Sequence, residues 1–274
     1  MPVGEIITCP SGLSGRLRGM KVREEKILAD RKLARNGAQL DELLAACWEE
    51  TLDPGPYKFE GPKPNWTQVL QGDRFYALLQ LRAITYGPEY SFAVTCREPK
   101  CRSRIDWEVN LCDLPVRPLW GTNLDAFVAG NRFSTALPDA KKTVSFRLLV
   151  GADERQLVRL KRDAGDTFLA ASIAFRLLDI DGVSPKDKRR FVNDLSLADA
   201  RHLGEEFQRA DCGVETSFEV ECQSCFATQE VELPFETDFF LPTKGRFSRT
   251  SISRGGAKAP STSSGSSTED PASA

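Results

Sequence analysis

Four cysteines form two close pairs, and these pairs carry the clearest chemistry in the sequence. Four residues separate Cys96 from Cys101, and two separate Cys222 from Cys225. A closed structural zinc site takes four soft or borderline ligands at tetrahedral angles, and a short turn between two cysteines places both sulfurs on one side of the ion. Cys96, Cys101, Cys222 and Cys225 are therefore predicted to bind one structural Zn²⁺.

The segments around the two pairs resemble each other. Residues 91–96 and 217–222 both begin Ser-Phe, continue with Val two residues later and end in a cysteine. Each pair is followed by a second alternating segment, so each unit reads as strand, cysteine knuckle, strand. Two facing knuckles of this kind form a zinc ribbon. Because 120 residues lie between Cys101 and Cys222, the middle of the chain is predicted to be inserted between the two halves of one ribbon.

Two other interpretations of the paired cysteines are a dithiol redox switch and clusters of buried free thiols. A redox site typically has one C-x-x-C beside a βαβ pattern, and the duplicated pairs disfavour it. Cys9, Cys47, Cys112 and Cys212 have no close partner in sequence. We expect these four to be buried as small apolar side chains, with Cys112 and Cys212 as less favoured substitute ligands.

The sequence contains no recognisable catalytic motif, so no enzymatic activity and no small-molecule substrate are predicted. Its one histidine, His202, cannot supply an H-E-x-x-H site and is expected on a solvated helix face. Gly255-Gly256 precedes no predicted helix, so it does not read as a phosphate-binding loop. A cysteine-dependent enzyme is a third functional class for this chain, and an enzyme of that class is expected to have exposed reactive thiols.

Composition places the chain among ordinary globular proteins. Hydrophobic residues make up 41% and charged residues 28% of 274 residues, enough for a sizeable core. Outside a basic tail from Thr243 onward, the chain has 32 basic and 37 acidic residues, which gives this body a formal net charge of −5. This acidic body disfavours nucleic acid as a partner, because phosphate binding needs concentrated Lys and Arg.

Neither a membrane span nor a secretory signal is expected. No stretch reaches the roughly 18 apolar residues that suggest a span, and residues 1–10 lack a basic region followed by an apolar run. The protein is therefore expected to fold in a reducing cytoplasm, where close cysteine pairs indicate metal ligands before disulfides.

The elements that must position the cysteines indicate an α+β fold. A hairpin turning at Pro10-Ser11-Gly12 is predicted first, followed by helices over 22–34, 40–48 and 73–86. Strands are predicted over 91–95, 105–111, 142–150 and 218–221, and one more strand is predicted to end at residue 233. Helices are predicted over 152–162 and 167–178, and two further helices are predicted to begin at Pro185 and after Ser196. The predicted regions are 1–90 (N-terminal hairpin and helices), 91–114 (first zinc knuckle), 115–212 (inserted, mostly helical α/β middle region), 213–242 (second knuckle and C-terminal strand) and 243–274 (disordered tail).

Several segments, taken in order, resemble the T4-type baseplate hub assembly proteins of contractile-tailed phages and related contractile injection systems. The resemblance rests on the Pro10-Ser11-Gly12 turn and on segments 20–26, 72–87, 105–111, 218–225 and 234–240. It spans roughly residues 4–242. The four-residue spacing between Cys96 and Cys101 departs from the two residues expected there.

The resemblance implies a non-enzymatic structural or assembly protein, chaperone or hub subunit, of a contractile tail baseplate. Its partners would be baseplate hub or wedge proteins. It would act in the host or bacterial cytoplasm during assembly, with the virion baseplate as a further location. The alternative is a zinc-ribbon nucleic-acid-binding protein of the transcription or translation type.

Overall fold

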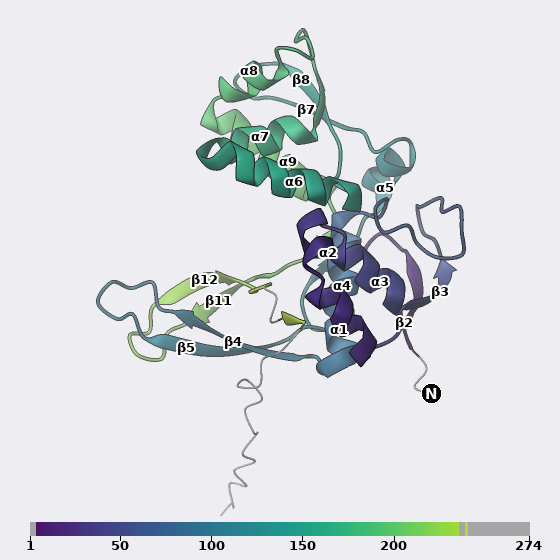
Figure 1. Ribbon diagram of the computed structural model, residues 1–274. Coiled ribbons are helices and arrows are strands. Elements are labelled where there is room, and N and C mark those ends of the chain that lie inside the picture. The colour runs from purple at the N-terminus through teal and green to yellow at the C-terminus, as the bar shows by residue number, and fades with distance from the viewer. Residues whose placement is uncertain (1–3, 236–238, 241–274) are drawn as a thin grey trace, which may run out of the picture. The chain divides into compact units, whose positions relative to one another are not determined.

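Helices and small antiparallel sheets follow one another along the chain, giving the mixed α+β fold that the sequence predicts (Figure 1). The computed structural model describes residues 4–235 and 239–240. The described residues belong to one compact unit. The tail predicted to be disordered, 243–274, lies outside the described residues. In the described part, no helix has both the length and the apolar character needed to cross a bilayer.

The chain begins with a three-stranded antiparallel sheet in the order β1 (Glu5–Thr8), β2 (Ser14–Leu17), β3 (Trp48–Asp53). The predicted turn joins β1 to β2, and Gly12 adopts φ +101° there, which favours glycine. Gly15 is needed for a different reason, since a Cβ at this position would lie 2.2 Å from the buried ring of Trp48. Strand β3 was not predicted, and the helix expected through Trp48 ends one residue earlier.

The helix predicted over 22–34 is two helices, α1 (Val22–Ala29) and α2 (Arg31–Asn36), so the single-helix prediction is wrong. Asp30 has extended backbone angles, and its carboxylate accepts hydrogen bonds from the amides of Lys32 (2.7 Å) and Leu33 (3.2 Å). An aspartate that caps the second helix in this way ends the first. Gly37 ends α2 with φ +65°, as predicted. Helix α3 (Gln39–Cys47) follows.

Helix α4 (Gln71–Tyr86) carries a buried carboxylate near its start. Asp73 is fully buried and accepts hydrogen bonds from the Ser11 amide (2.9 Å), the Ser11 hydroxyl and the Tyr57 hydroxyl (2.5 Å). The thiol of Cys212 lies 3.8 Å from the same carboxylate. One side chain thus joins the N-terminal turn, the proline-rich loop, α4 and the end of the middle section. Burial is the largest influence on Asp73 and raises its pKa.

Two β-hairpins follow the pattern expected around the cysteine pairs. One is β4 (Glu89–Thr95) with β5 (Arg104–Asn110), and the other is β11 (Ser217–Glu221) with β12 (Thr228–Glu232). Alternate residues are buried because the hairpins lie side by side (Figure 1) and the rings of Phe92 and Phe218 are 5.8 Å apart. The outward faces carry mainly carboxylates.

The segment after β12 packs on α4. The ring of Phe235 lies 5.1 Å from that of Phe75, and the ring of Phe239 lies 4.9 Å from that of Tyr90. The Tyr86 hydroxyl donates to the carbonyl of Phe240 at 3.0 Å. Phe239 and Phe240 are both buried, which fits their expected place at the end of the ordered body.

The middle section enters and leaves through paired strands. Val116 pairs with Val214 and Arg117 with Gly213 in an antiparallel bridge between β6 and β10. The described elements of this section are β6 (Val116–Arg117), α5 (Gly121–Val128), β7 (Phe133–Ala136), β8 (Thr143–Phe146), α6 (Gly151–Ala164), the 3₁₀ turn η1 (Gly165–Thr167), α7 (Phe168–Arg176), β9 (Leu177–Ile180), α8 (Lys188–Asn193), α9 (Leu197–Ala210) and β10 (Gly213–Val214).

Three predictions for the middle section need correction. Strand β8 covers only part of the predicted 142–150, and the helix predicted to residue 178 gives way to β9 at Leu177, which pairs with β8. Ser196 caps α9 by accepting from the Asp199 amide at 3.1 Å, as predicted. Asp199 does not complete a capping box, because its carboxylate instead accepts from the amides of Asp139 and Ala140.

Candidate metal centre

The four predicted cysteines come together at the tips of the two hairpins. Their four sulfur atoms all lie within 4.8 Å of one another. The Sγ atoms of Cys96 and Cys225 are 3.7 Å apart, as are those of Cys101 and Cys222. A tetrahedral ion with sulfur ligands at about 2.3 Å requires sulfur–sulfur separations of about 3.8 Å. The four side chains could therefore hold one metal ion.

Both knuckles close in the same way despite their different lengths. The amide of the first cysteine donates to the carbonyl two residues beyond the second cysteine, from Cys96 to Ser103 (2.9 Å) and from Cys222 to Ala227 (3.0 Å). The residue directly after the second cysteine has positive φ in each, Arg102 at 52° and Phe226 at 60°. The two additional residues of the longer knuckle lie at its start.

Backbone groups favour a thiolate at each of the four positions. The residue two places further along the chain makes a backbone hydrogen bond to each sulfur; the four cysteine and donor pairs are Cys96 with Glu98, Cys101 with Ser103, Cys222 with Ser224, and Cys225 with Ala227. Hydrogen bonds to a thiolate stabilise its charge and orient it, which is the geometry a metal-binding knuckle needs.

The four thiols compete for ionisation. The Ser103 hydroxyl and the Ser224 backbone lower the pKa of Cys222 to about 6. The Ala227 backbone acts in the same direction at Cys225, but burial and the neighbouring thiols outweigh it and raise the pKa of Cys225 to about 12. Four thiolates at these positions would need a cation between them, and binding one would release protons.

Two residues at the site went unrecognised in the sequence, Ser103 and Gln229. The Ser103 hydroxyl lies 3.1 Å from the sulfur of Cys101 and 3.1 Å from that of Cys222. The Gln229 side chain accepts from the Arg97 amide at 2.7 Å and donates to the Thr95 carbonyl at 3.3 Å, so it links the second hairpin to the first knuckle. Residue type alone gives no signal for either role.

The remaining cysteines lie outside the four-sulfur site. Cys9, Cys47 and Cys212 are buried, as expected, and burial raises the pKa of each, in Cys47 to about 11. They therefore stay thiols at neutral pH. Cys112 is exposed, so the prediction that it is buried is wrong.

His202 is half-buried, and its Nε2 lies 2.9 Å from the Thr135 hydroxyl. The expected solvated helix-face position therefore needs correction, since the ring connects α9 to β7. Among the described residues no acid–base–nucleophile set is recorded around it.

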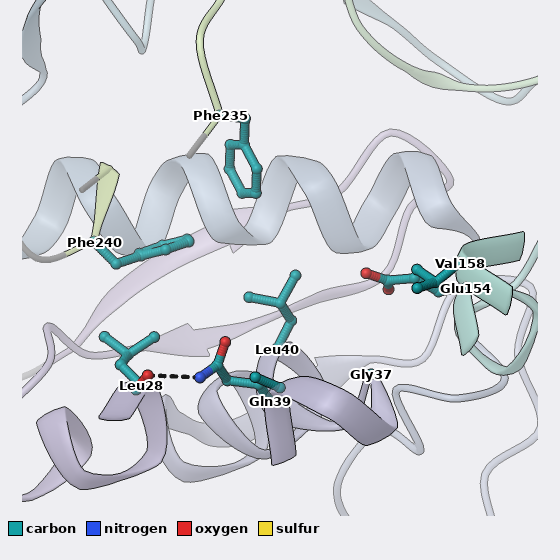
Figure 2. Close-up of a pocket in the computed structure, with 9 residues that line it drawn as sticks. Leu28, Gly37, Gln39, Leu40, Glu154, Val158, Phe235 and Phe240 are labelled. Atoms are coloured by element: carbon teal, nitrogen blue, oxygen red, sulfur yellow. Dashed lines mark hydrogen bonds between the residues drawn. The ribbon is translucent and has the colours of Figure 1, made fainter. Parts of the chain in front are cut away.

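A groove of about 220 Å³ runs between α1, α3, α6 and the segment after β12 (Figure 2). Apolar side chains form most of its walls, among them Leu28, Leu40 and Phe235. The side-chain Nε2 of Gln39 donates to the Leu28 carbonyl at 2.6 Å. Among the described residues of this lining, Glu154 contributes the one carboxylate, and it is paired with Arg74 at 2.6 Å.

Comparison with known proteins gives one family match. Residues 1–125 match the family described as T4 bacteriophage base plate protein. The matched part contains Cys96 and Cys101 but ends before Cys222 and Cys225. The match supports a phage baseplate protein. Neither the curated proteins nor the solved structures gave a match.

Proposed function

We propose that this chain is a non-enzymatic structural or assembly protein of a contractile-tail baseplate hub, and that one Zn²⁺ at Cys96, Cys101, Cys222 and Cys225 stabilises its split ribbon. The single observation that carries the baseplate role is the family match over residues 1–125. Its partners are hub or wedge subunits of the baseplate. The protein acts during assembly in the host or bacterial cytoplasm and in the virion baseplate.

The geometry of the four sulfurs supports a structural rather than a catalytic metal. Cys96 and Cys222 are fully buried, and Cys101 and Cys225 are partly buried. Four protein sulfurs fill a tetrahedral coordination sphere and leave no position for water or substrate. When bound, the zinc would neutralise the thiolates and hold the hairpins together across the inserted section.

The surface charge of the hairpins weighs against the nucleic-acid alternative. The outward face of β11 and β12 carries exposed carboxylates at Glu219, Glu221, Glu230 and Glu232. Glu219 and Glu230 lie directly opposite each other in the register. Such a face repels phosphate, whereas nucleic-acid-binding surfaces concentrate Lys and Arg.

Elemental analysis of the purified full chain tests the zinc site. We expect about one zinc per chain in the wild type and its loss in a Cys222→Ser/Cys225→Ser variant. Cys112→Ser is the matched control, because this exposed cysteine lies outside the four-sulfur site, and it should keep its zinc. A well-folded wild type without metal, or with iron in place of zinc, would contradict the zinc proposal.

Deletion of the gene, followed by electron microscopy of the particles, tests the baseplate role. We expect deletion of the gene to abolish normal baseplates in electron micrographs of the contractile particles. Complementation with the wild type or Cys112→Ser should restore them, and the Cys222→Ser/Cys225→Ser variant should not. Normal, functional baseplates in the deletion strain would overturn this role while leaving the metal result untouched.

A further inference from the structure

The two knuckles match each other in backbone but differ in one side chain at an equivalent position. Ser103 and Ala227 each lie two residues beyond the second cysteine of their knuckle. Each accepts the amide of the first cysteine and makes a backbone hydrogen bond to the second. The Ser103 hydroxyl is therefore an addition that the closing of a knuckle does not require.

This hydroxyl reaches sulfurs from both knuckles. Its oxygen lies 3.1 Å from Cys101 Sγ in its own knuckle and 3.1 Å from Cys222 Sγ in the other. A metal-bound thiolate carries no proton, so the hydroxyl must be the donor in the loaded site. One O–H can thus stabilise either thiolate while holding the two sulfurs at a fixed separation.

We infer that Ser103 is a positioning residue of the metal centre, whose hydroxyl orients Cys101 and Cys222 toward the ion and strengthens its binding. The inference rests on the proposed zinc site. The longer knuckle needs such a contact more, because four residues between its cysteines constrain the sulfurs less than two. Partners that orient metal ligands typically contribute about 10–100-fold to metal affinity.

The test compares Ser103→Ala, which makes the first knuckle like the second, with Ser103→Thr, which restores a hydroxyl. Ala227→Ser is the matched control, since it adds a hydroxyl at the equivalent position. Zinc affinity of the full chain is measured by competition with a chromophoric chelator. We expect at least tenfold weaker binding in Ser103→Ala, near-wild-type binding in Ser103→Thr, and no weakening in Ala227→Ser.

A spectroscopic readout separates this role from general destabilisation. With Co²⁺ in place of zinc, loss of the hydrogen bond raises the energy of the thiolate electrons, so the sulfur-to-cobalt charge-transfer band should move to longer wavelength in Ser103→Ala and return in Ser103→Thr. Unchanged affinity and an unchanged band in Ser103→Ala would overturn the inference alone. A wild-type chain that binds neither zinc nor cobalt would overturn the zinc proposal and this inference together.

Discussion

Glu24 is a buried carboxylate in the first turn of helix α1. It accepts hydrogen bonds from the Lys21 amide (2.6 Å), from Arg18 (2.9 Å) and from Arg23 (2.7 Å). Burial alone would raise its pKa, but the hydrogen bonds from Arg18, Arg23 and the Lys21 amide outweigh burial and lower the pKa of Glu24 to about 2. A glutamate in the unfolded chain has a pKa of about 4.3, so the native state favours the ionised form.

Glu24→Gln is expected to lower the free energy of unfolding by about 2 kcal/mol at pH 7, because charge-assisted hydrogen bonds to Arg18 are lost. The contribution of Glu24 is fully present above the unfolded pKa and disappears as pH falls through about 2. The difference between wild type and variant should therefore shrink as pH falls from about 5 toward 2. Urea unfolding at several pH values measures it.

Glu25→Gln is the matched control for this prediction, because the neighbouring side chain is exposed. It should change the free energy of unfolding little at any pH. Equal effects of the two substitutions would contradict the role assigned to Glu24.

At the scale of single residues, the sequence predicts ligands better than it predicts their supports. Paired cysteines are recognisable because their spacing is itself the geometry of a knuckle. Ser103 and Gln229 act only after folding brings one hairpin against the other, so nothing in their local sequence marks them. Cys112 was expected to be buried because it is a small apolar side chain next to a predicted strand, but it is exposed.

The first knuckle depends on the second hairpin through Gln229. The Arg97 amide, in the additional residues of the longer knuckle, has the Gln229 side chain as its acceptor. In Gln229→Ala this amide should exchange with deuterium about fivefold faster, which corresponds to losing about 1 kcal/mol of protection. Hydrogen–deuterium exchange of the zinc-loaded chain measures the change.

Thr228→Ala is the control for Gln229→Ala, since Thr228 is an exposed neighbour on the same strand. Its substitution should leave exchange at Arg97 unchanged, and both variants should keep their zinc. Unaltered exchange at Arg97 in Gln229→Ala would show that the contact does not support the knuckle.

Elements with their own periodic pattern were predictable, and elements defined by a partner were not. The long helix α4 and the two hairpins follow apolar repeats that the sequence displays. Strand β3 was missed because its pairing with β2 spans three intervening helices, and β9 was missed because its residues continue an apolar helical pattern. The break at Asp30 depends on a capping contact that outweighs a good helical composition over 22–34.

Asp73 joins segments from distant parts of the chain, so its removal tests the molecule as a whole. Asp73→Ala would leave the Ser11 amide, the Ser11 hydroxyl and the Tyr57 hydroxyl without their acceptor. We expect the free energy of unfolding to fall by about 3 kcal/mol, because buried donors without partners are costly. Asp163→Ala, which removes an exposed carboxylate, is the control in the same denaturant unfolding experiment. A loss no larger than in the control would contradict this role.

The largest feature of the molecule is a middle section that lies between the two halves of one predicted ribbon. It was predictable from the cysteine spacing and from the similarity of the segments around the two cysteine pairs. The sequence did not predict how that section is joined to the rest of the chain. The pairing of β6 with β10 involves only two residues on each strand, too few to leave a pattern.

The sequence separation of the four sulfurs also sets an order of events during synthesis. Cys222 follows Cys101 by 121 residues, so at about 5–20 residues per second the ribosome delivers it about 6 to 24 seconds later. Until then the first knuckle offers only two of the four thiolates. A chain that terminates early can never complete the cluster, so metal capture would mark the molecules whose translation has passed Cys225.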